Sequence, residues 1–426
     1  MAQPSSAMTT TSSIGTVSAA RASTVAAKFE AHQDPAREAR SFWLLAAAGA
    51  WVTLLGLAAA HVMEEHGHAI TGMDNQIVWG LPHVFAIFMI VAASGVLNVA
   101  SIGSVFGQPL YKPRAPLSGL LCLALLAGGL MVLMLDLGRP ERVIVALTHY
   151  NFTSVFAWNV FLYSGMAAIV AVYLFTLFER RAAGWTQPVG IAALVWRFVL
   201  TTGTGSIFGF LVARQAYQSA LLAPLFIVLS FAWGLAVFLV VQSAMLAWEG
   251  LELPPAVERR LARLLAIFIA TALYFVAVHH LTNAYYVRQA AFETFVLLGW
   301  GGGEPYALLL WVGYGLLGSA VPFALLLWPA KLGRAGLAVA GGFVVLGAFA
   351  FLYVFVIGSQ AFPLDIFPGH VVKSTFGDGQ VATYAPRWPE WMLGLGGVGA
   401  AFLMTVIGVR VLDMMPRDET AAAAAE

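Results

Sequence analysis

Long apolar runs separated by short polar connections make up most of this chain. A membrane-spanning α-helix needs about 20 predominantly apolar residues, and we count ten runs of that kind. They lie at 43–63, 79–101, 116–136, 153–178, 190–213, 222–246, 261–281, 306–328, 335–357 and 391–412. The pattern predicts an all-α fold, a polytopic bundle of about ten transmembrane helices embedded in a lipid bilayer.

The segments outside these runs leave no room for a separate soluble domain. Residues 1–40 are rich in Ser, Thr and Ala and lack the apolar core of about 7–15 residues that marks a secretory signal, so a disordered tail is expected. The Ala-rich residues 416–426 predict a second tail. We therefore expect one integral membrane domain over 41–415. Chemistry on any terminal substrate would have to come from partner proteins.

Composition supports the membrane assignment and argues against nucleic-acid and cysteine-ligated metal sites. Of the 426 residues, 60% are hydrophobic and only 10% are charged, which is far from the composition of a soluble domain. The net charge of +1 comes without a basic patch, which argues against nucleic acid as a partner. The single cysteine, Cys122, lies within a run. It can form no disulfide within the chain and hold no cysteine-ligated cluster or zinc, and we predict no metal site.

Lysine and arginine in the connections predict the orientation, because cytoplasmic loops of membrane proteins carry an excess of both. The connections after even-numbered runs and the two tails carry most of them: Arg21, Lys28, Arg37, Arg40, Lys112, Arg114, Arg180, Arg181, Arg259, Arg260, Arg263, Lys331, Arg334 and Arg417. The connections after odd-numbered runs carry fewer: Arg139, Arg142, Arg214, Arg288, Lys373 and Arg387. Both termini should be cytoplasmic, and the odd-numbered connections should face outward.

This orientation gathers the histidines at one side of the membrane. Apart from His32 in the tail, all fall at the outer side: His61, His66, His68, His83, His149, His279, His280 and His370. The carboxylates Asp74 and Asp136 lie on the same side. Histidine and carboxylate exchange protons near neutral pH, so the set predicts proton-linked chemistry near the outer surface. The alternative for any one histidine is a structural role in the headgroup region.

The connection between the third and fourth runs places charge at the mouth of two membrane helices. Asp136 ends one run and Arg139 follows three residues later, an arrangement that is costly unless the charges have a partner or a function. The alternative is a capped helix end, with Gly138 in the turn and Arg139 reaching the headgroups. His83 lies one turn into the second run. Its imidazole needs a hydrogen-bond partner, which Asp136 or Asn151 could supply.

A quinone site fits this set of residues. A quinone needs an apolar slot and one or two titratable groups at its carbonyl oxygens, and His, Asp and Tyr near a membrane surface would serve. A haem b needs two histidines from different helices. His61, His83 and either His279 or His280 could meet at the outer ends, so a single haem site remains an alternative. None of these histidines lies in mid-membrane, which argues against a haem wire across the bilayer.

Two other interpretations remain open. A proton or anion transporter could use the same polar groups, although the cytoplasmic halves of the runs are apolar apart from Arg197, which could snorkel to the surface. A passive membrane anchor for redox subunits would need no quinone site at all. The long connection 358–390 contains turn signals such as Gly358 and Pro363. Its length suggests a docking surface for an external partner.

Two sequence blocks resemble a known family. Leu-Asp-Leu-Gly-Arg-Pro at 135–140, followed by Tyr-Asn-Phe-Thr-Ser at 150–154 and by Trp158, resembles the signature of the NrfD/PsrC family of polytopic membrane subunits. The ten runs point to the long branch. Further stretches, Ile70 to Ala92, Thr201 to Phe226 and Gly358 to Gly394, resemble the DsrP subunits of Dsr sulfur-metabolism complexes.

The resemblance implies a ten-helix bundle in the bacterial inner membrane that binds menaquinone or ubiquinone near its outer face. Electrons would pass to or from a periplasmic, ferredoxin-like iron–sulfur subunit of a respiratory or sulfur-metabolism oxidoreductase. Cytochrome c and further membrane subunits are additional candidate partners, and haem b stays open without support. Carried over by position, His83 and Asp136 would bind the quinone and exchange its protons, with Arg139 as a structural or docking cation. Further candidates are Asp74, Tyr150 and Asn151.

Overall fold

The computed structural model describes residues 35–327, 332–364, 379–412 and 414. The chain divides into two units, 1–47 and 48–426, and the arrangement discussed below is that of the second. The predicted tail 416–426, His370 and Lys373 lie outside the described residues, as does the predicted tail up to residue 34. The first helix begins at Pro35, inside the segment predicted as a tail.

Each of the ten apolar runs coincides with a helical segment long and apolar enough to cross a membrane, which confirms the predicted fold class. No strand occurs in the described ranges. The ten segments are α2 (Pro35–His66), α3 (Leu81–Ser104), η2–α4 (Pro109–Arg114 and Ala115–Leu135), α6 (Val155–Phe178), η4–α7 (Arg180–Trp185 and Thr186–Gly209), α8 (Leu222–Trp248), α9 (Pro255–Tyr285), α11–η5–α12 (Glu304–Leu308, Leu309–Ala320 and Val321–Leu327), α13–η6–α14 (Gly333–Leu352, Tyr353–Gly358 and Ser359–Ala361) and α15 (Trp388–Val411). The shorter elements are η1 (His68–Ile70), η3 (Pro140–Arg142), α5 (Val143–Thr148) and α10 (Val287–Leu298).

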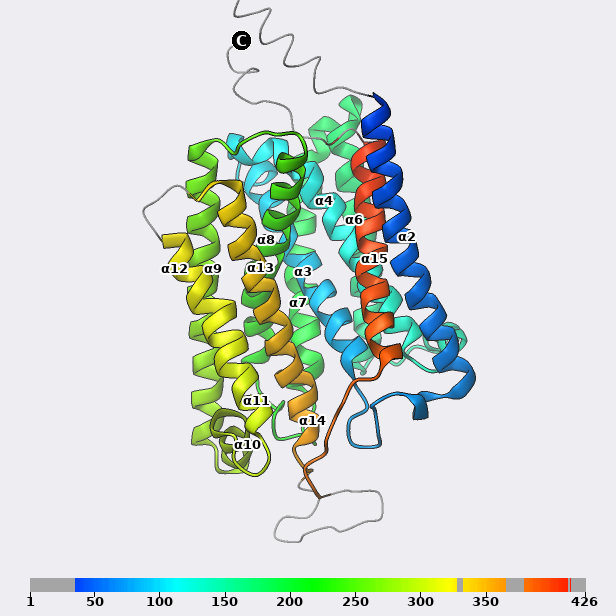
Figure 1. The fold of residues 1–426 in the computed structure, drawn as a ribbon, viewed down its shortest axis with the longest axis vertical. Coiled ribbons are helices and arrows are strands. Elements are labelled where there is room, and N and C mark those ends of the chain that lie inside the picture. The colour runs from blue at the N-terminus through cyan, green and yellow to red at the C-terminus, as the bar shows by residue number, and fades with distance from the viewer. Residues whose placement is uncertain (1–34, 328–331, 365–378, 413, 415–426) are drawn as a thin grey trace, which may run out of the picture. The chain divides into compact units, whose positions relative to one another are not determined.

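Helix α3 lies at the centre of the second unit and packs against α4, α7, α8 and α15 (Figure 1). Nearly all of its side chains are buried, as expected for a helix that is apolar on every face. It approaches α8 closely where Gly95 and Gly234 face each other. A Cβ on Gly95 would lie 1.6 Å from the carbonyl oxygen of Ser230, and one on Gly234 would lie 2.2 Å from the carbonyl carbon of Gly95. Glycine at both positions lets the two backbones touch.

Arg197 in α7 does not snorkel, contrary to one interpretation of the sequence. The residue is buried, and Nη1 donates to Asn98 Oδ1 at 2.7 Å and to the carbonyl oxygen of Ser94 at 3.3 Å, both on α3. Its guanidinium also lies over the rings of Phe198 and Phe231. Polar groups on α3 and aromatic faces give it enough partners to stay inside the bundle, where it joins α3 to α7.

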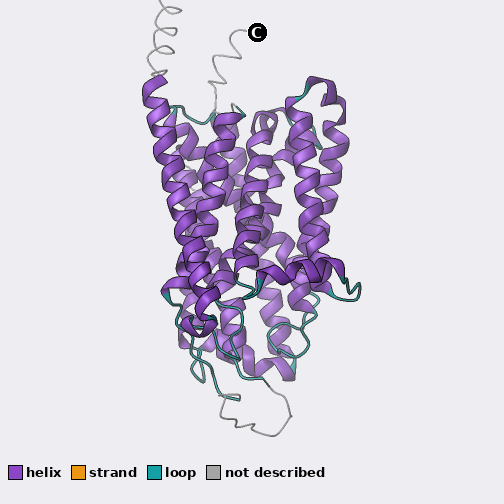
Figure 2. Ribbon diagram, turned by 90° about the vertical axis from the view of Figure 1, so that its right-hand side faces the viewer, coloured by secondary structure: helices purple, strands orange, loops and turns teal. Residues whose placement is uncertain are grey.

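The odd-numbered connections gather at one end of the bundle, at the bottom of Figures 1 and 2. At this end, here called the site end, α2, α4, α7, α9 and α14 finish, and α3, α6, α8 and α15 begin. The last connection begins later than predicted. Residues 358–361, interpreted from the sequence as turns, continue the helix, and π-helical winding at Tyr353–Gly358 precedes them. This extension brings Gln360 to the site end.

Candidate functional site

Asp136 directly follows the last residue of α4, and the turn after it explains its position. Its N–H bonds the carbonyl oxygen of Val132 at 3.1 Å, completing the helix. Gly138 then adopts φ 71°, a backbone conformation that favours glycine, and Pro140 opens η3. A Cβ on Gly138 would lie 3.0 Å from Cε1 of His68. Glycine therefore serves both to reverse the chain and to admit the His68 ring.

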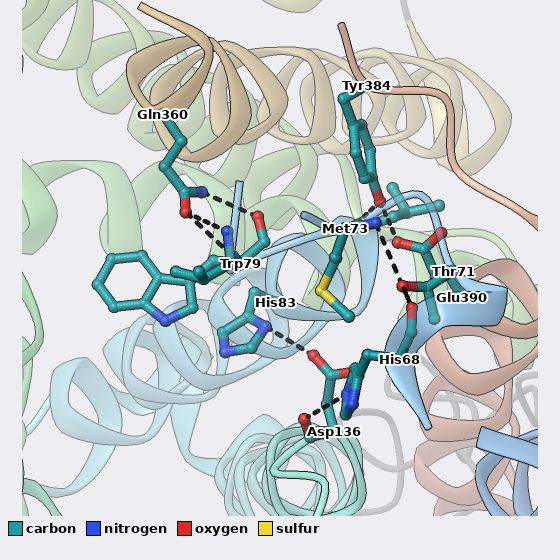
Figure 3. A network of polar contacts seen from close by, with 11 residues as sticks. His68, Thr71, Met73, Trp79, His83, Asp136, Gln360, Tyr384 and Glu390 are labelled. Atoms are coloured by element: carbon teal, nitrogen blue, oxygen red, sulfur yellow. Dashed lines mark hydrogen bonds and ion pairs between the residues drawn. The ribbon is translucent and has the colours of Figure 1, made fainter. Parts of the chain in front are cut away.

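The Asp136 carboxylate lies between two imidazoles (Figure 3). Oδ2 is 2.7 Å from Nδ1 of His83, on the first turn of α3. Oδ1 is 3.7 Å from Nε2 of His68 in η1, and the same nitrogen lies 3.2 Å from the backbone oxygen of Asp136. The exposed fraction of the side chain is 1% for Asp136, 13% for His83 and 34% for His68. We call these three residues the His68–Asp136–His83 group.

The two imidazoles determine the charge of the carboxylate. Burial alone would raise the pKa of Asp136, but hydrogen bonding and charge from His68 and His83 outweigh it, so the pKa lies below its ordinary value. For His68, the hydrogen bond to Asp136 raises the pKa above its ordinary value and prevails over partial burial. Asp136 is therefore an ionised acceptor, and a proton arriving at the group is held on an imidazole.

A buried glutamine holds the segment that leads into His83. Gln360 is fully buried at the end of α14. Its Oε1 accepts from the N–H groups of Val78 and Trp79 at 3.1 and 3.0 Å, and its Nε2 donates to the carbonyl oxygens of Trp79 and Val356 at 2.9 and 2.8 Å. The indole of Trp79 stacks on the ring of His83, with centroids 6.0 Å apart. The glutamine thus holds the backbone that places Trp79 against the His83 ring.

A buried glutamate holds the beginning of α3 itself. Glu390, fully buried in the first turn of α15, accepts at Oε2 from the N–H groups of Gly72 and Arg387 at 2.7 and 2.8 Å. Its Oε1 accepts from the Tyr384 hydroxyl, whose oxygen in turn accepts from the N–H of Leu81 at 2.6 Å. Burial and the neighbouring carboxylate raise the pKa of Tyr384, which keeps it a proton donor. The chain is thereby fixed two residues before His83 (Figure 3).

A cavity of about 110 Å³ borders the group on the side of α2. Its walls are mainly apolar, and its titratable side chains are His61, Glu64 and His68. The apolar walls come from α2 and from the end of α4 with its turn: Leu57, Ala60, Met63, Leu135, Gly138 and Pro140. Apolar walls with a few polar groups at one side are typical of sites for small organic molecules.

The structure brings together only two of the six residues that the sequence analysis assigned to the site, His83 and Asp136. The predicted partner of His83 is therefore Asp136 and not Asn151. Asp74 accepts at Oδ1 from the N–H groups of Gln76 and Ile77, which closes the turn before α3. Arg139 is exposed, and its side chain makes no hydrogen bond or ion pair within the described ranges.

Tyr150 and Asn151 instead shape the entry to α6. The Tyr150 hydroxyl donates to the carbonyl oxygen of Ala157, and its ring lies 4.3 Å from that of Phe161, centroid to centroid. Oδ1 of Asn151 accepts from the N–H and the hydroxyl of Thr153 at 3.0 and 2.7 Å. Among the described residues, neither side chain forms a hydrogen bond with the His68–Asp136–His83 group, so their assignment to the site stays a prediction.

The remaining histidines occupy separate environments. Nδ1 of His280 lies 2.7 Å from Oε2 of the buried Glu293 on α10, and the side-chain amide of Asn283 donates to Oε1 of the same carboxylate at 3.0 Å. His61 faces Glu65 on its own helix at 3.3 Å. The three histidine positions that could supply haem ligands are each paired with a different carboxylate: His61 with Glu65, His83 with Asp136 and His280 with Glu293. No three His, Cys, Asp or Glu side chains among the described residues are placed to hold a metal ion.

Sequence reasoning missed the residues that build the site around Asp136. The sequence pattern indicates His68 only as one of the outer histidines and Gln360 only as part of a turn. It does not point to Tyr384 or Glu390 as members of the site. One signal was available: Glu390 directly precedes the last apolar run and Gln360 lies three residues after the ninth, where a buried polar side chain needs a partner.

Comparison with known proteins agrees with this fold. A family model described as "Polysulphide reductase, NrfD" matches residues 69–364, well over half of the chain. The chain belongs to the NrfD family. It is 29% identical to the "Hdr-like menaquinol oxidoreductase integral membrane subunit" of Archaeoglobus fulgidus, over 86% of this chain and 91% of that protein.

Two other relatives align over similar lengths. A putative membrane subunit of dimethyl sulfoxide reductase from Halobacterium salinarum is 26% identical over 88% of this chain and 92% of its own length. A selenate reductase subunit from Mesobacillus selenatarsenatis is 23% identical over 87% and 93%. This NrfD family member is therefore similar along nearly its whole length to subunits of oxidoreductases, and it is a multi-pass integral membrane protein.

Proposed function

We propose that this protein is the quinone-interacting membrane subunit of an oxidoreductase complex. The observation that carries the proposal is the His68–Asp136–His83 group, a buried carboxylate between two imidazoles beside an apolar-walled cavity. A quinone requires both features: apolar walls for its ring and tail, and proton-exchanging groups at its oxygens. The name of the Archaeoglobus relative, a menaquinol oxidoreductase subunit, supports the same substrate class.

In this proposal the chemical role of the protein is proton transfer. Oxidation of a quinol releases two protons and two electrons, and reduction of a quinone takes up the same. Asp136, ionised and held at 2.7 Å from His83, stabilises a proton on an imidazole and orients the ring that carries it. The exposed third of His68 gives that proton a way to solvent. Either direction of turnover can use the same groups.

The electrons need a partner outside this chain. We infer a periplasmic, ferredoxin-like iron–sulfur subunit, in keeping with the names of the relatives as subunits of redox enzymes. The site end would then face the periplasm of the bacterial inner membrane, with both termini in the cytoplasm, as the distribution of Lys and Arg predicts. Membership of the DsrP branch, and with it a role in sulfur metabolism, is the more specific part of this proposal.

Turnover of the complete complex tests the proposal. We expect His83→Ala and Asp136→Asn to lower quinol-dependent reduction of the partner by about 100-fold or more, since each disrupts the His68–Asp136–His83 group that handles the quinol protons. His149→Ala is the matched control, because His149 is an exposed histidine in an odd-numbered connection outside the group. Unchanged turnover in both site variants would contradict the proposal.

A further inference from the structure

We propose that the quinone headgroup binds in the cavity between α2 and the end of α4, and that His68, not His83, is the side chain that hydrogen-bonds to it. The inference rests on the proposed function and makes it more specific. His83 would then act through Asp136 as a positioning residue. His68 had no place in the site that the sequence predicted.

The lining of the cavity supports this assignment. Of the three residues in the His68–Asp136–His83 group, only His68 borders the cavity. The Asp136 side chain is almost fully enclosed and that of His83 is only slightly exposed, whereas one third of the His68 side chain is accessible. A molecule in the cavity therefore reaches the buried carboxylate through the His68 ring.

The two nitrogens of His68 are differently engaged. Nε2 faces the backbone oxygen of Asp136 at 3.2 Å and its carboxylate at 3.7 Å. Nδ1 lies on the side of Gly138, where an added Cβ would come within 3.4 Å of it, and Gly138 is part of the cavity wall. Nδ1 makes no hydrogen bond to any residue in the described part of the chain. It is the nitrogen that can accept from a quinol hydroxyl, with the Nε2 proton directed at Asp136.

The proton balance is complete with these groups. The quinol hydroxyl at His68 transfers its proton to Nδ1, and the resulting imidazolium is stabilised by the Asp136 carboxylate. The hydroxyl on the opposite side of the ring gives its proton to water or to His61 or Glu64, which also line the cavity, while two electrons leave one at a time for the iron–sulfur partner. After the transfer His68 releases its proton to solvent from its exposed edge. In quinone reduction the same steps run backwards.

The apolar walls account for the rest of the molecule. Leu57, Ala60 and Met63 are spaced three residues apart on one side of α2, and this helix has apolar side chains that the bundle leaves uncovered, among them Trp51, Leu54 and Leu57. In a membrane these face lipid. An isoprenoid tail can thus leave the cavity along α2 while the headgroup stays at His68.

A pair of tryptophan substitutions on α2 tests the position of the headgroup. Leu57 lines the cavity and is 40% exposed, and Leu54, one turn away, is 57% exposed and lies outside it. We expect Leu57→Trp to fill the cavity and weaken binding of a fluorescent menaquinol analogue to the purified full-length chain by about tenfold or more, with Leu54→Trp at wild-type affinity. A wild-type melting temperature for Leu57→Trp would establish that it folds.

Variants of His68 and His83 separate contact from positioning. His68→Ala should weaken analogue binding about tenfold through the lost hydrogen bond. In the complex it should raise KM and also lower kcat, because the proton acceptor is lost. His83→Ala should keep near wild-type affinity and lower kcat. Full affinity in both Leu57→Trp and His68→Ala, with turnover still dependent on His83, would overturn this location and leave the proposed function standing. Failure of the wild-type chain to bind the analogue would overturn both.

Discussion

At the scale of single residues, the site depends on where the chain can place a buried charge. Asp136 is enclosed, and its ionised form persists because His68 and His83 face it from two other segments. A carboxylate left there without these partners would be costly to bury. The charge at the helix mouth was predictable from the sequence, and so was one of its partners. The second partner was not, since the loop that contains His68 has no regular pattern.

Gly138 provides a test at this scale, because Gly67 has the same φ of 71° with no atom near its missing Cβ. Alanine at either position should cost about 1–2 kcal/mol of stability through backbone strain. Only Gly138→Ala also pushes against the His68 ring, at 3.0 Å. We expect thermal unfolding to shift similarly in both variants and analogue binding to fall in Gly138→Ala alone. Equal affinity in the two variants would show that the His68 position is unimportant for binding.

At the scale of elements, the helices were predictable and their ends were not. The apolar runs indicated all ten spans, because a bilayer requires a length and composition that few other structures share. The boundary at 358 was wrong by several residues, since the helix continues to Ala361 through π-helical winding. Glycine and serine at 358–359 are typical of turns, and the burial of Gln360 overrides that local preference.

Gln360 also allows a test of how α14 holds the segment before α3. Gln360→Ala removes four hydrogen bonds and leaves the N–H groups of Val78 and Trp79 without their acceptor. We expect a loss of about 1–3 kcal/mol in stability and a lower quinol turnover, because Trp79 stacks on His83. Gln187→Ala is the control: that side chain is exposed and makes one hydrogen bond of 3.5 Å. Stability equal to the control would contradict this role.

At the scale of the whole molecule, the described parts of the odd-numbered connections lie at one end, and those after the first, third and ninth spans assemble a site from distant parts of the chain. The His68–Asp136–His83 group, Gln360, Tyr384 and Glu390 come from five separate segments. The alternation of the ten spans predicted which connections share a side, and thus that His83 and Asp136 could meet. The contacts of Gln360 and Glu390 depend on how the last two helices pack against α3, which no local pattern in the sequence records.

The central claim is that this assembled end of the bundle binds a quinone. The most direct measurement is a titration of the purified full-length protein, in mild detergent, with a fluorescent menaquinol analogue after its visible spectrum has been recorded. We predict saturable quenching and no haem Soret band. A Soret band would make outer histidines haem ligands and require a different site. Absence of saturable binding would contradict the quinone assignment.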